Sequence, residues 1–184
     1  MRAGSPTGER GYGVAMSTRG ALPYVDPQAS RGPLYRAYVR FLGTRVAAWL
    51  SIHFVWQADP YVMRLTGGRI GMGLMLPTAL LQTRGARSGQ IRRNGVIYFN
   101  DLERVTIVAS KLGAPEHPAW FHNARANPDV LLGGRPFRAE IVEDEAERTR
   151  LWELADRVFP PYAAYRERAA RAGRRIPILL LVPR

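Results

Sequence analysis

The ten residues from Arg84 to Arg93 have the composition of an anion-binding turn. They contain four arginines, two glycines and no acidic residue, and apolar segments lie on both sides. Glycine lets the backbone turn and approach a ligand closely. Guanidinium groups, a serine hydroxyl (Ser88) and backbone N–H groups are the donors that bind a phosphate. The segment predicts either an anion site or a solvated basic turn, and its residues alone do not decide between them.

A second group of polar and aromatic residues lies further along the chain. Ser110 and Lys111 end an apolar segment, and a loop leads to the run His117-Pro118-Ala119-Trp120-Phe121-His122-Asn123. Proline in the first turn predicts a helix that begins there, and helix N-termini attract anions. Trp120 and Phe121 offer flat apolar faces to an aromatic ring system. In the alternative interpretation, Trp120 belongs to the core and Lys111 is merely exposed.

Three aromatic residues, Phe159, Tyr162 and Tyr165, lie three positions apart around Pro160-Pro161. This spacing places their rings near one face of a helix. A tyrosine at this place is able to stack on a ligand or to donate a hydrogen bond to it. The residues by themselves favour the other interpretation, a hydrophobic contact between two helices.

The composition excludes several kinds of chemistry. The chain has no cysteine, which excludes disulfides, thiolate nucleophiles, iron–sulfur clusters and cysteine-built zinc sites. No pair of its three histidines (His53, His117 and His122) has the HxxxH spacing of a helical zinc site. We therefore expect no metal ion in the site.

The net charge of +12 indicates an anionic partner. Of the 27 basic residues, all but Lys111 are arginines, and only 15 residues are acidic. Such a chain attracts nucleic acid, an acidic membrane surface or a polyanionic small molecule. The arginines are scattered and no nucleic-acid-binding motif is present, which argues against nucleic acid.

The 184 residues predict one compact domain with additions at its N-terminus. Residues 1–32, with six glycines and three prolines, are expected to be a flexible tail without a secretory signal. Residues 33–66 are expected to form an amphipathic helical segment, in which apolar residues recur at helical spacing up to Trp56. This helix either covers one face of the domain or lies on an anionic membrane with Trp49 and Trp56 at the headgroup level. We expect a cytoplasmic protein, peripheral to the membrane in the second case.

Residues 67–184 alternate between short strands and a few helices. Gly133-Gly134 is a tight hairpin signal, and the acidic residues after Asp144 favour a helix start. The patterns predict an α+β fold that is mainly β, an antiparallel β-barrel decorated by helices. The expected strands are Met72–Gln82, Gly95–Phe99, Val105–Ser110, Val130–Leu132, Phe137–Val142 and Ile176–Val182. The expected helices are Pro118–Asn127, Asp144–Val158 and Tyr162–Ala172.

Four blocks, in this order and spacing, resemble the deazaflavin (F420)-dependent nitroreductase family. They are TRGARSGQIRRNGVIYF (83–99), VASKLGAPEHPAWFHNARANPDV (108–130), FPPYAAY (159–165) and GRRIPILLLVP (173–183). Members of that family are oxidoreductases with a split β-barrel like that of FMN-binding proteins, and the resemblance covers about residues 72–184. It implies coenzyme F420, a reduced 8-hydroxy-5-deazaflavin with a ribityl-phosphate arm and a glutamate tail. Such a polyanion accounts for a basic groove without nucleic acid.

The resemblance also implies a set of cofactor-binding residues. The phosphate end would contact Ala86, Arg87, Ser88 and Arg92. The ring and arm would lie above Arg93, Asn94, Gly95, Val96, Ile97 and Tyr98. The third strand would contribute Val108, Ala109, Ser110 and Lys111, the following helix Ala119, Trp120, Phe121, His122 and Asn123, and the C-terminal region Tyr162.

The reaction implied is hydride transfer from the reduced deazaflavin to a quinone-like, nitroaromatic or other conjugated, electron-poor compound. Ser110, Tyr162 and Tyr165 are the expected catalytic residues, because each is able to bind the substrate oxygen or relay a proton. Phe159 and Phe121 replace tyrosines that the family often has, so the substrate is not carried over from the resemblance. The alternative to an enzyme is a non-catalytic barrel that carries F420 or a lipid.

Overall fold

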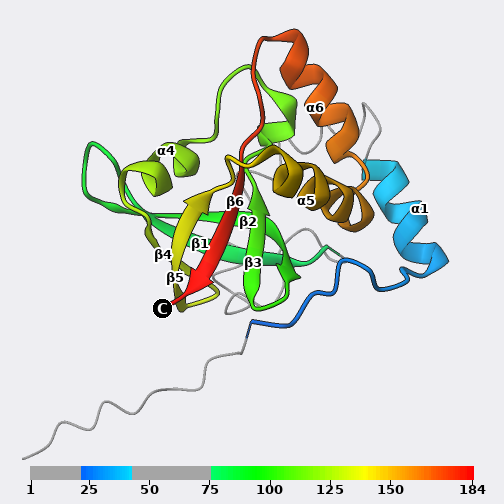
Figure 1. Cartoon of the computed structure of the whole chain (residues 1–184), viewed down its shortest axis with the longest axis horizontal. Coiled ribbons are helices and arrows are strands. Elements are labelled where there is room, and N and C mark those ends of the chain that lie inside the picture. Colours follow the sequence, from blue (N-terminus) through cyan, green and yellow to red (C-terminus); the bar gives the residue numbers. More distant parts are fainter. Residues whose placement is uncertain (1–21, 43–75) are drawn as a thin grey trace, which may run out of the picture.

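The computed structural model describes residues 22–42 and 76–184 of the chain. Six strands form a closed antiparallel barrel in the order β1-β2-β3-β6-β5-β4 (Figure 1). This confirms the predicted β-barrel with helices. The strands are β1 (Thr78–Arg84), β2 (Ile91–Asp101), β3 (Arg104–Val108), β4 (Asp129–Leu132), β5 (Arg135–Ile141) and β6 (Ile178–Pro183).

The helices lie outside the barrel (Figure 1). They are α1 (Pro33–Leu42), α4 (Ala119–Ala126), α5 (Glu145–Val158) and α6 (Tyr162–Arg171), with a short 3₁₀ turn, η2 (Lys111–Gly113). The start of α5 agrees with the sequence, since the Asp144 carboxylate caps it by accepting a hydrogen bond from the Glu147 amide at 2.7 Å. Within the described residues, no helix is long and apolar enough to cross a membrane.

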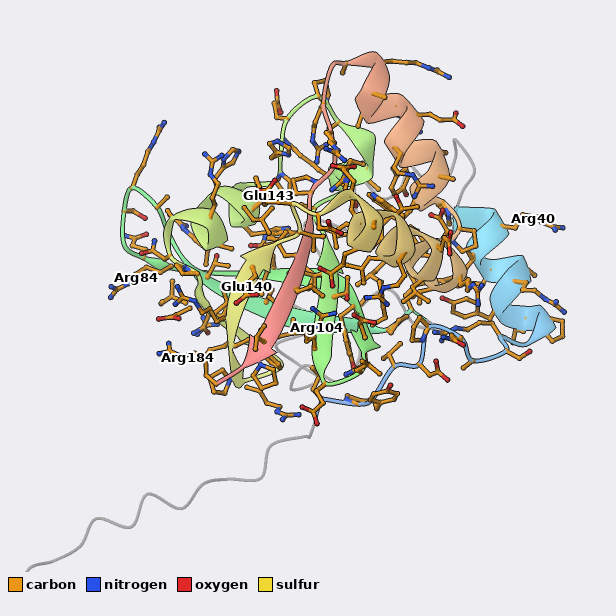
Figure 2. All side chains as sticks on the ribbon, in the orientation of Figure 1. Arg40, Arg84, Arg104, Glu140, Glu143 and Arg184 are labelled. Carbon is orange, nitrogen blue, oxygen red and sulfur yellow. The ribbon has the colours of Figure 1, made fainter. Side chains whose placement is uncertain are left out.

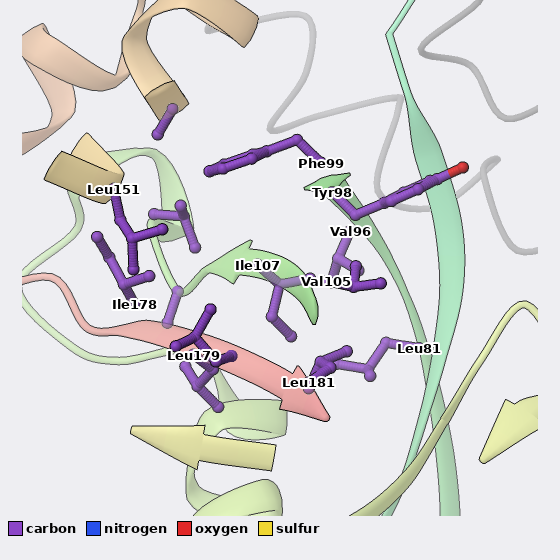
Figure 3. Close-up of a cluster of buried hydrophobic side chains, with 14 of the residues drawn as sticks. Leu81, Val96, Tyr98, Phe99, Val105, Ile107, Leu151, Ile178, Leu179 and Leu181 are labelled. Atoms are coloured by element: carbon purple, nitrogen blue, oxygen red, sulfur yellow. The ribbon is translucent and has the colours of Figure 1, made fainter. Parts of the chain in front are cut away.

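The core fills the barrel and continues beneath the helices. Val96, Ile107 and Leu181, from three strands, are almost fully buried and lie close together (Figure 3). Because side chains alternate along a strand, Leu179 and Leu181 lie on one face of β6, and Ile178 and Leu180 on the other. All four are buried, which means that β6 is covered on both faces.

The tight turn between β4 and β5 depends on its two glycines. Gly133 and Gly134, between β4 and β5, have φ angles of 57° and 84°, which glycine adopts without steric cost. Strand β2 is longer than predicted, because its backbone already pairs with β1 from Ile91 onward. Because the side chains of Arg92 and Arg93 are polar and exposed, the hydrophobic pattern does not reveal that the strand begins before them.

Part of the expected tail differs from the prediction. Residues 22–32 contain no helix or strand, yet Val25 is buried and pairs with Asn100 of β2. The Val25 amide donates to Asn100 Oδ1 at 2.8 Å, and the Asn100 amide donates to the Val25 carbonyl at 2.9 Å. The hydroxyl of Tyr98 donates to the Pro23 carbonyl at 2.9 Å. These side-chain and backbone partners, which no periodicity reveals, hold the segment against the barrel.

The described part of the N-terminal helix packs on the domain. Tyr35 and Val39 of α1 are buried, and the Tyr35 hydroxyl donates to the Val158 carbonyl at the end of α5 at 2.5 Å. For residues 33–42, the structure agrees with a helix that covers one face. The hypothesis of membrane contact depends on Trp49 and Trp56, which lie outside the described residues, and it stays a prediction.

An ion-pair network joins the β2–β3 turn to α5. The Asp101 carboxylate, almost fully buried, accepts two hydrogen bonds from Arg150, both at 2.8 Å, and one from Arg104 at 2.8 Å. Arg104 also donates to Glu147 at 2.9 Å. The hydrogen bonds from Arg150 and Arg104 hold the pKa of Asp101 below its usual value. The network therefore stabilises the folded state only while this carboxylate is charged.

Replacing Asp101 with asparagine should lower the free energy of unfolding by about 2 kcal/mol at pH 7, because two guanidinium groups lose their carboxylate. The loss should shrink at acid pH. With a lowered folded-state pKa, the stabilisation is present above the unfolded-state pKa of about 3.9 and disappears as pH falls through the folded-state value. Urea unfolding of both proteins from pH 7 to pH 3 measures this difference.

The matched control is Glu167→Gln, which removes an exposed carboxylate 3.9 Å from Arg171 on α6. Exposed pairs contribute little, so this variant should differ from the parent protein by less than about 0.5 kcal/mol. Equal losses in the two variants would contradict the role assigned to Asp101.

Candidate functional site

The turn between β1 and β2 is shaped by its two glycines. The Gly85 amide donates to the Gln90 carbonyl at 2.8 Å, and the Gly89 amide donates to the Gly85 carbonyl at 2.9 Å. Gly89 has a φ of 65°, and a Cβ at Gly85 would lie 2.7 Å from the Ser88 hydroxyl. Any larger residue at these two positions would therefore distort the turn.

The four arginines of the turn keep their positive charge unpaired within the described part of the chain. Arg92 donates to the side-chain Oε1 of Gln90 at 3.2 Å, and Arg93 donates to the side-chain Oε1 of Gln82 at 3.0 Å. Both acceptors are neutral. Arg84 and Arg87 are exposed, and Arg84 projects outward from the barrel (Figure 2). No carboxylate of residues 22–42 or 76–184 forms an ion pair with any of the four. The turn therefore carries a concentrated positive charge that attracts anions.

Asn123 ties helix α4 to this turn. Its Oδ1 accepts a hydrogen bond from the Ala86 amide at 3.0 Å, and its Nδ2 donates to the Thr83 hydroxyl at 3.2 Å. One turn further along, Asn127 donates to the Arg84 carbonyl at 3.3 Å. The first two candidate groups of the sequence therefore meet in space. Among residues 22–42 and 76–184, no side chain caps the N-terminal end of α4.

The loop between β3 and α4 has an unusual backbone. Lys111, Leu112 and Gly113 have φ angles of 46°, 55° and 76° in succession. The left-handed region costs a non-glycine residue about 1–2 kcal/mol, so other contacts must hold the loop. Arg168 of α6 does so in part, because it donates to the Leu112 carbonyl at 2.7 Å.

The main support of this loop is Arg174, which the sequence analysis assigned no role. Its guanidinium group is almost fully buried and donates to three loop carbonyls: Ala109, Ser110 at 3.1 Å and Ala114 at 2.6 Å. Arg174 lies in the block GRRIPILLLVP that carried the family resemblance, but nothing in the sequence shows that distant carbonyls converge on it.

Arg174 also fixes the state of His117. Its Nε donates to His117 Nδ1 at 3.1 Å, and an accepting Nδ1 carries no proton. Burial and the Arg174 charge lower the pKa of His117. The imidazole is therefore neutral at pH 7, with its proton on Nε2. It lies beside Phe121, at a ring distance of 4.9 Å, where α4 begins.

Two of the three aromatic side chains of α4 are buried in the protein core. Trp120 and Phe121 are 4% exposed, which agrees with the core interpretation of Trp120, whereas Ala119 and His122 are exposed. Lys111 pairs with Glu116 at 2.8 Å. The apolar side chains thus form a floor beneath the helix start, and the groups open to a ligand are small or polar.

The run predicted along β2 does not present one continuous face. Side chains alternate, so Asn94, Val96 and Tyr98 lie on one face and Arg93, Gly95 and Ile97 on the other. Val96 and Tyr98 are buried, and the Tyr98 hydroxyl is bound to the Pro23 carbonyl. Only one of the two sets can present its side chains to a given ligand.

Tyr162 and Tyr165 lie in a buried aromatic cluster with Phe159 and Trp152. The ring centroids of Phe159 and Tyr162 are 5.0 Å apart, and those of Trp152 and Tyr162 are 6.0 Å apart. This is the helix contact that the residues by themselves favoured. Burial raises the pKa of both tyrosines, so their hydroxyls stay protonated and are able to donate but not to act as bases.

The aromatic cluster and the β3–α4 loop touch at Gly113. A Cβ at this glycine would lie 2.6 Å from the Tyr165 carbonyl oxygen and 3.0 Å from the Arg168 Cβ. The described residues therefore place the basic turn against the middle and end of α4, whereas the β3–α4 loop leads to the start of α4 and packs on α6.

Comparisons with known proteins show the family of the chain. The profile of the F420H(2)-dependent quinone reductase family matches residues 57–183. An F420H(2)-dependent quinone reductase of Mycobacterium tuberculosis H37Rv is 32% identical over 150 residues, which cover 76% of this chain and 99% of that protein.

Two solved structures were also compared. One, described as a domain-swapped dimer, is 32% identical with a TM-score of 0.52, and the match covers 68% of this chain and 96% of that one. A solved F420-H2-dependent reductase is 35% identical with a TM-score of 0.49, over 57% of this chain and 93% of that one.

Gly113→Ala should lower the free energy of unfolding by about 2–4 kcal/mol, because the new methyl group clashes with the α6 backbone and the residue has a positive φ. Gly173→Ala is the matched control: Gly173 has a φ of 69°, but nothing lies within 4 Å of its added Cβ. In the control, the free energy of unfolding should fall only by the cost of a positive φ at alanine, about 1 kcal/mol. Urea unfolding compares them, and equal losses would show that the loop does not pack on α6 as described.

Proposed function

This chain belongs to the F420H(2)-dependent quinone reductase family, and we propose that it transfers a hydride from reduced coenzyme F420 to a quinone-like or other conjugated, electron-poor substrate. The chain is an oxidoreductase that uses F420. The substrate, the hydride step and the residues at the site are the proposal. The observation that carries it is the contact, through Asn123, between the middle of α4 and a basic turn whose arginines have no ion-pair partner among the described residues.

The described residues suit a polyanionic deazaflavin. The phosphate and the glutamate tail would be held by the turn, where the Arg87 and Arg92 guanidinium groups and the Ser88 hydroxyl are exposed. Ala86 would contact the phosphate beside Asn123, which fixes its position. The ring would lie towards the loop that Arg174 supports, between Ala109 to Lys111 and the residues from Ala119 to His122.

The chain's own contribution is to orient the ring and exclude water. When bound, reduced F420 supplies the hydride and the protein supplies orientation and electrostatics. The buried Trp120 and Phe121 make the floor of the site apolar, and a hydride donor and acceptor must approach to about 3–3.5 Å in such a site. An apolar floor, together with phenylalanine at 121 and 159, favours a flat conjugated substrate such as a quinone over a strongly polar one.

Ser110 is the residue proposed to hold the substrate oxygen. It is half-buried and follows the buried Val108 and Ala109 at the end of β3. Its carbonyl is bound by Arg174, which fixes the backbone from which the hydroxyl projects. Tyr162 and Tyr165 are proposed as hydrogen-bond donors from the α6 side of the loop, and since both are buried, this role requires the aromatic cluster to open.

Arg87→Ala should raise the dissociation constant of reduced F420 by about tenfold or more, since one charge-assisted hydrogen bond to an anion is lost. A titration that follows the coenzyme's fluorescence measures it. Arg157→Ala is the matched control, because Arg157 is exposed on α5, away from the turn. An unchanged constant in Arg87→Ala would remove the turn from the site, and no binding by the parent protein would overturn the proposal.

Ser110→Ala should lower kcat with a quinone by about 10–100-fold while the dissociation constant of F420 changes less than about threefold, because the hydroxyl is proposed to act on the substrate. Oxidation of reduced F420 by a panel of quinones and nitroaromatics measures turnover. Ser88→Ala is the control that should weaken coenzyme binding instead. Coenzyme binding without oxidation by any acceptor would favour a carrier and contradict the enzymatic proposal.

A further inference from the structure

A basic hollow lies between α5 and α6, away from the β1–β2 turn. Its volume is ≈ 470 Å³, within the range of small-ligand pockets. Side chains of α5, of α6 and of the segment that leads to β6 form its walls. The charged residues of these walls are four arginines (Arg148, Arg166, Arg174 and Arg175) and one acidic residue, Glu145.

Three of the four arginines already have partners. Arg166 forms two hydrogen bonds with the Asp156 carboxylate, at 2.7 and 2.6 Å, and its guanidinium carbon lies 4.3 Å from the centre of the Trp152 ring. Arg175 pairs with Glu145. Arg174 donates to the loop carbonyls and to His117, as described above. The charges of Arg166 and Arg175 are therefore paired with carboxylates, and the guanidinium group of Arg174 is occupied by hydrogen bonds.

Arg148 is different. Its residue is 8% exposed, and the one hydrogen bond found for its guanidinium group among the described residues goes to the Ile176 carbonyl at 2.5 Å. No carboxylate of residues 22–42 or 76–184 forms an ion pair with it. A charge with so little exposure and no counter-charge is costly, because few water molecules reach it. Within the described part of the chain, none of its nitrogens is both fully buried and without a partner, so the guanidinium group is open to the hollow that it lines.

The surroundings increase this cost. Burial and the neighbouring positive charge of Arg175 lower the pKa of Arg148, although Glu145 and Glu143 act in the opposite direction. Glu145 is shared with Arg175, so its charge is already compensated. An oxyanion in the hollow would supply the missing counter-charge to Arg148, and guanidinium is the side-chain group best suited to hold a carboxylate or phosphate.

We propose that the hollow between α5 and α6 is a second ligand site, which binds the carboxylate or phosphate group of a small molecule on Arg148, with Arg175 at its rim. The site is distinct from the proposed coenzyme site. One wall residue of the hollow, Arg174, also donates to carbonyls of the β3–α4 loop, which borders the proposed coenzyme site.

The test is thermal unfolding of the full chain in increasing inorganic phosphate, and separately in acetate, at an ionic strength held constant with NaCl. Phosphate or acetate should raise Tm saturably, by about 3–6 °C at ten times the dissociation constant, because the anion binds only the folded protein. Whichever anion acts at the lower concentration identifies the chemistry preferred.

Three variants localise the effect. Arg87→Ala, which removes an anion contact from the proposed coenzyme site, should keep a saturable rise, because the hollow still binds the anion. Adding Arg148→Met to Arg87→Ala should abolish the rise, whereas adding Arg157→Met, which removes an exposed charge from the same helix, should not. A rise retained in Arg87→Ala/Arg148→Met, or lost in Arg87→Ala alone, would overturn the proposal, as would a parent protein whose Tm does not respond beyond the effect of NaCl.

If Arg148→Met does not fold, the parent protein still decides the question. In a phosphate titration followed by NMR, the backbone amide signals of residues 148–152 and 173–176 should shift together along one saturable curve. Shifts confined to residues 85–93 would place the anion at the coenzyme turn and overturn the second site. This result is independent of whether F420 is turned over.

Discussion

The geometry of the candidate site depends on one buried guanidinium group. Arg174 donates to carbonyls of the β3–α4 loop and to His117 at the start of α4. It thereby holds a backbone in which Lys111, Leu112 and Gly113 all have positive φ angles. The converging carbonyls satisfy the hydrogen-bond donors of the buried guanidinium group, and these bonds make the loop rigid. A site needs such rigid support to keep its groups within reach of a reacting atom.

The barrel brings the other half of the site to this loop. The β1–β2 turn is rigid because both of its strands are paired along their length, and Asn123 bonds it to α4. The four guanidinium groups at the turn, which have no ion-pair partner among the described residues, concentrate positive charge beside α4. In the proposed site, the turn would hold the anionic arm of the coenzyme, and the flat ring would lie near the buried aromatic residues of α4.

Much of the fold could be predicted from local signals. The glycine pairs at 85/89 and 133/134, the Asp144 cap and the proline at the start of α4 act within a few residues, so the sequence displays them. What it could not display depends on partners far along the chain. The support that Arg174 gives to Ser110, the pairing of Val25 with Asn100 and the bond from Tyr98 to Pro23 join residues that no periodicity connects. The candidate residues of β2 were a contiguous run in the sequence, whereas a strand divides such a run between two faces.

The central claim is that the basic turn binds the charged arm of F420. The most direct measurement compares the dissociation constants of F420 and of the ribityl deazaflavin, which has the same ring and ribityl chain but neither phosphate nor glutamate, at increasing salt concentrations. If the claim holds, F420 binds at least about tenfold more tightly at low salt, and the difference narrows as salt screens the turn. Equal affinities at every salt concentration would mean that the ring alone determines binding and that the arginines of the turn have no part in it.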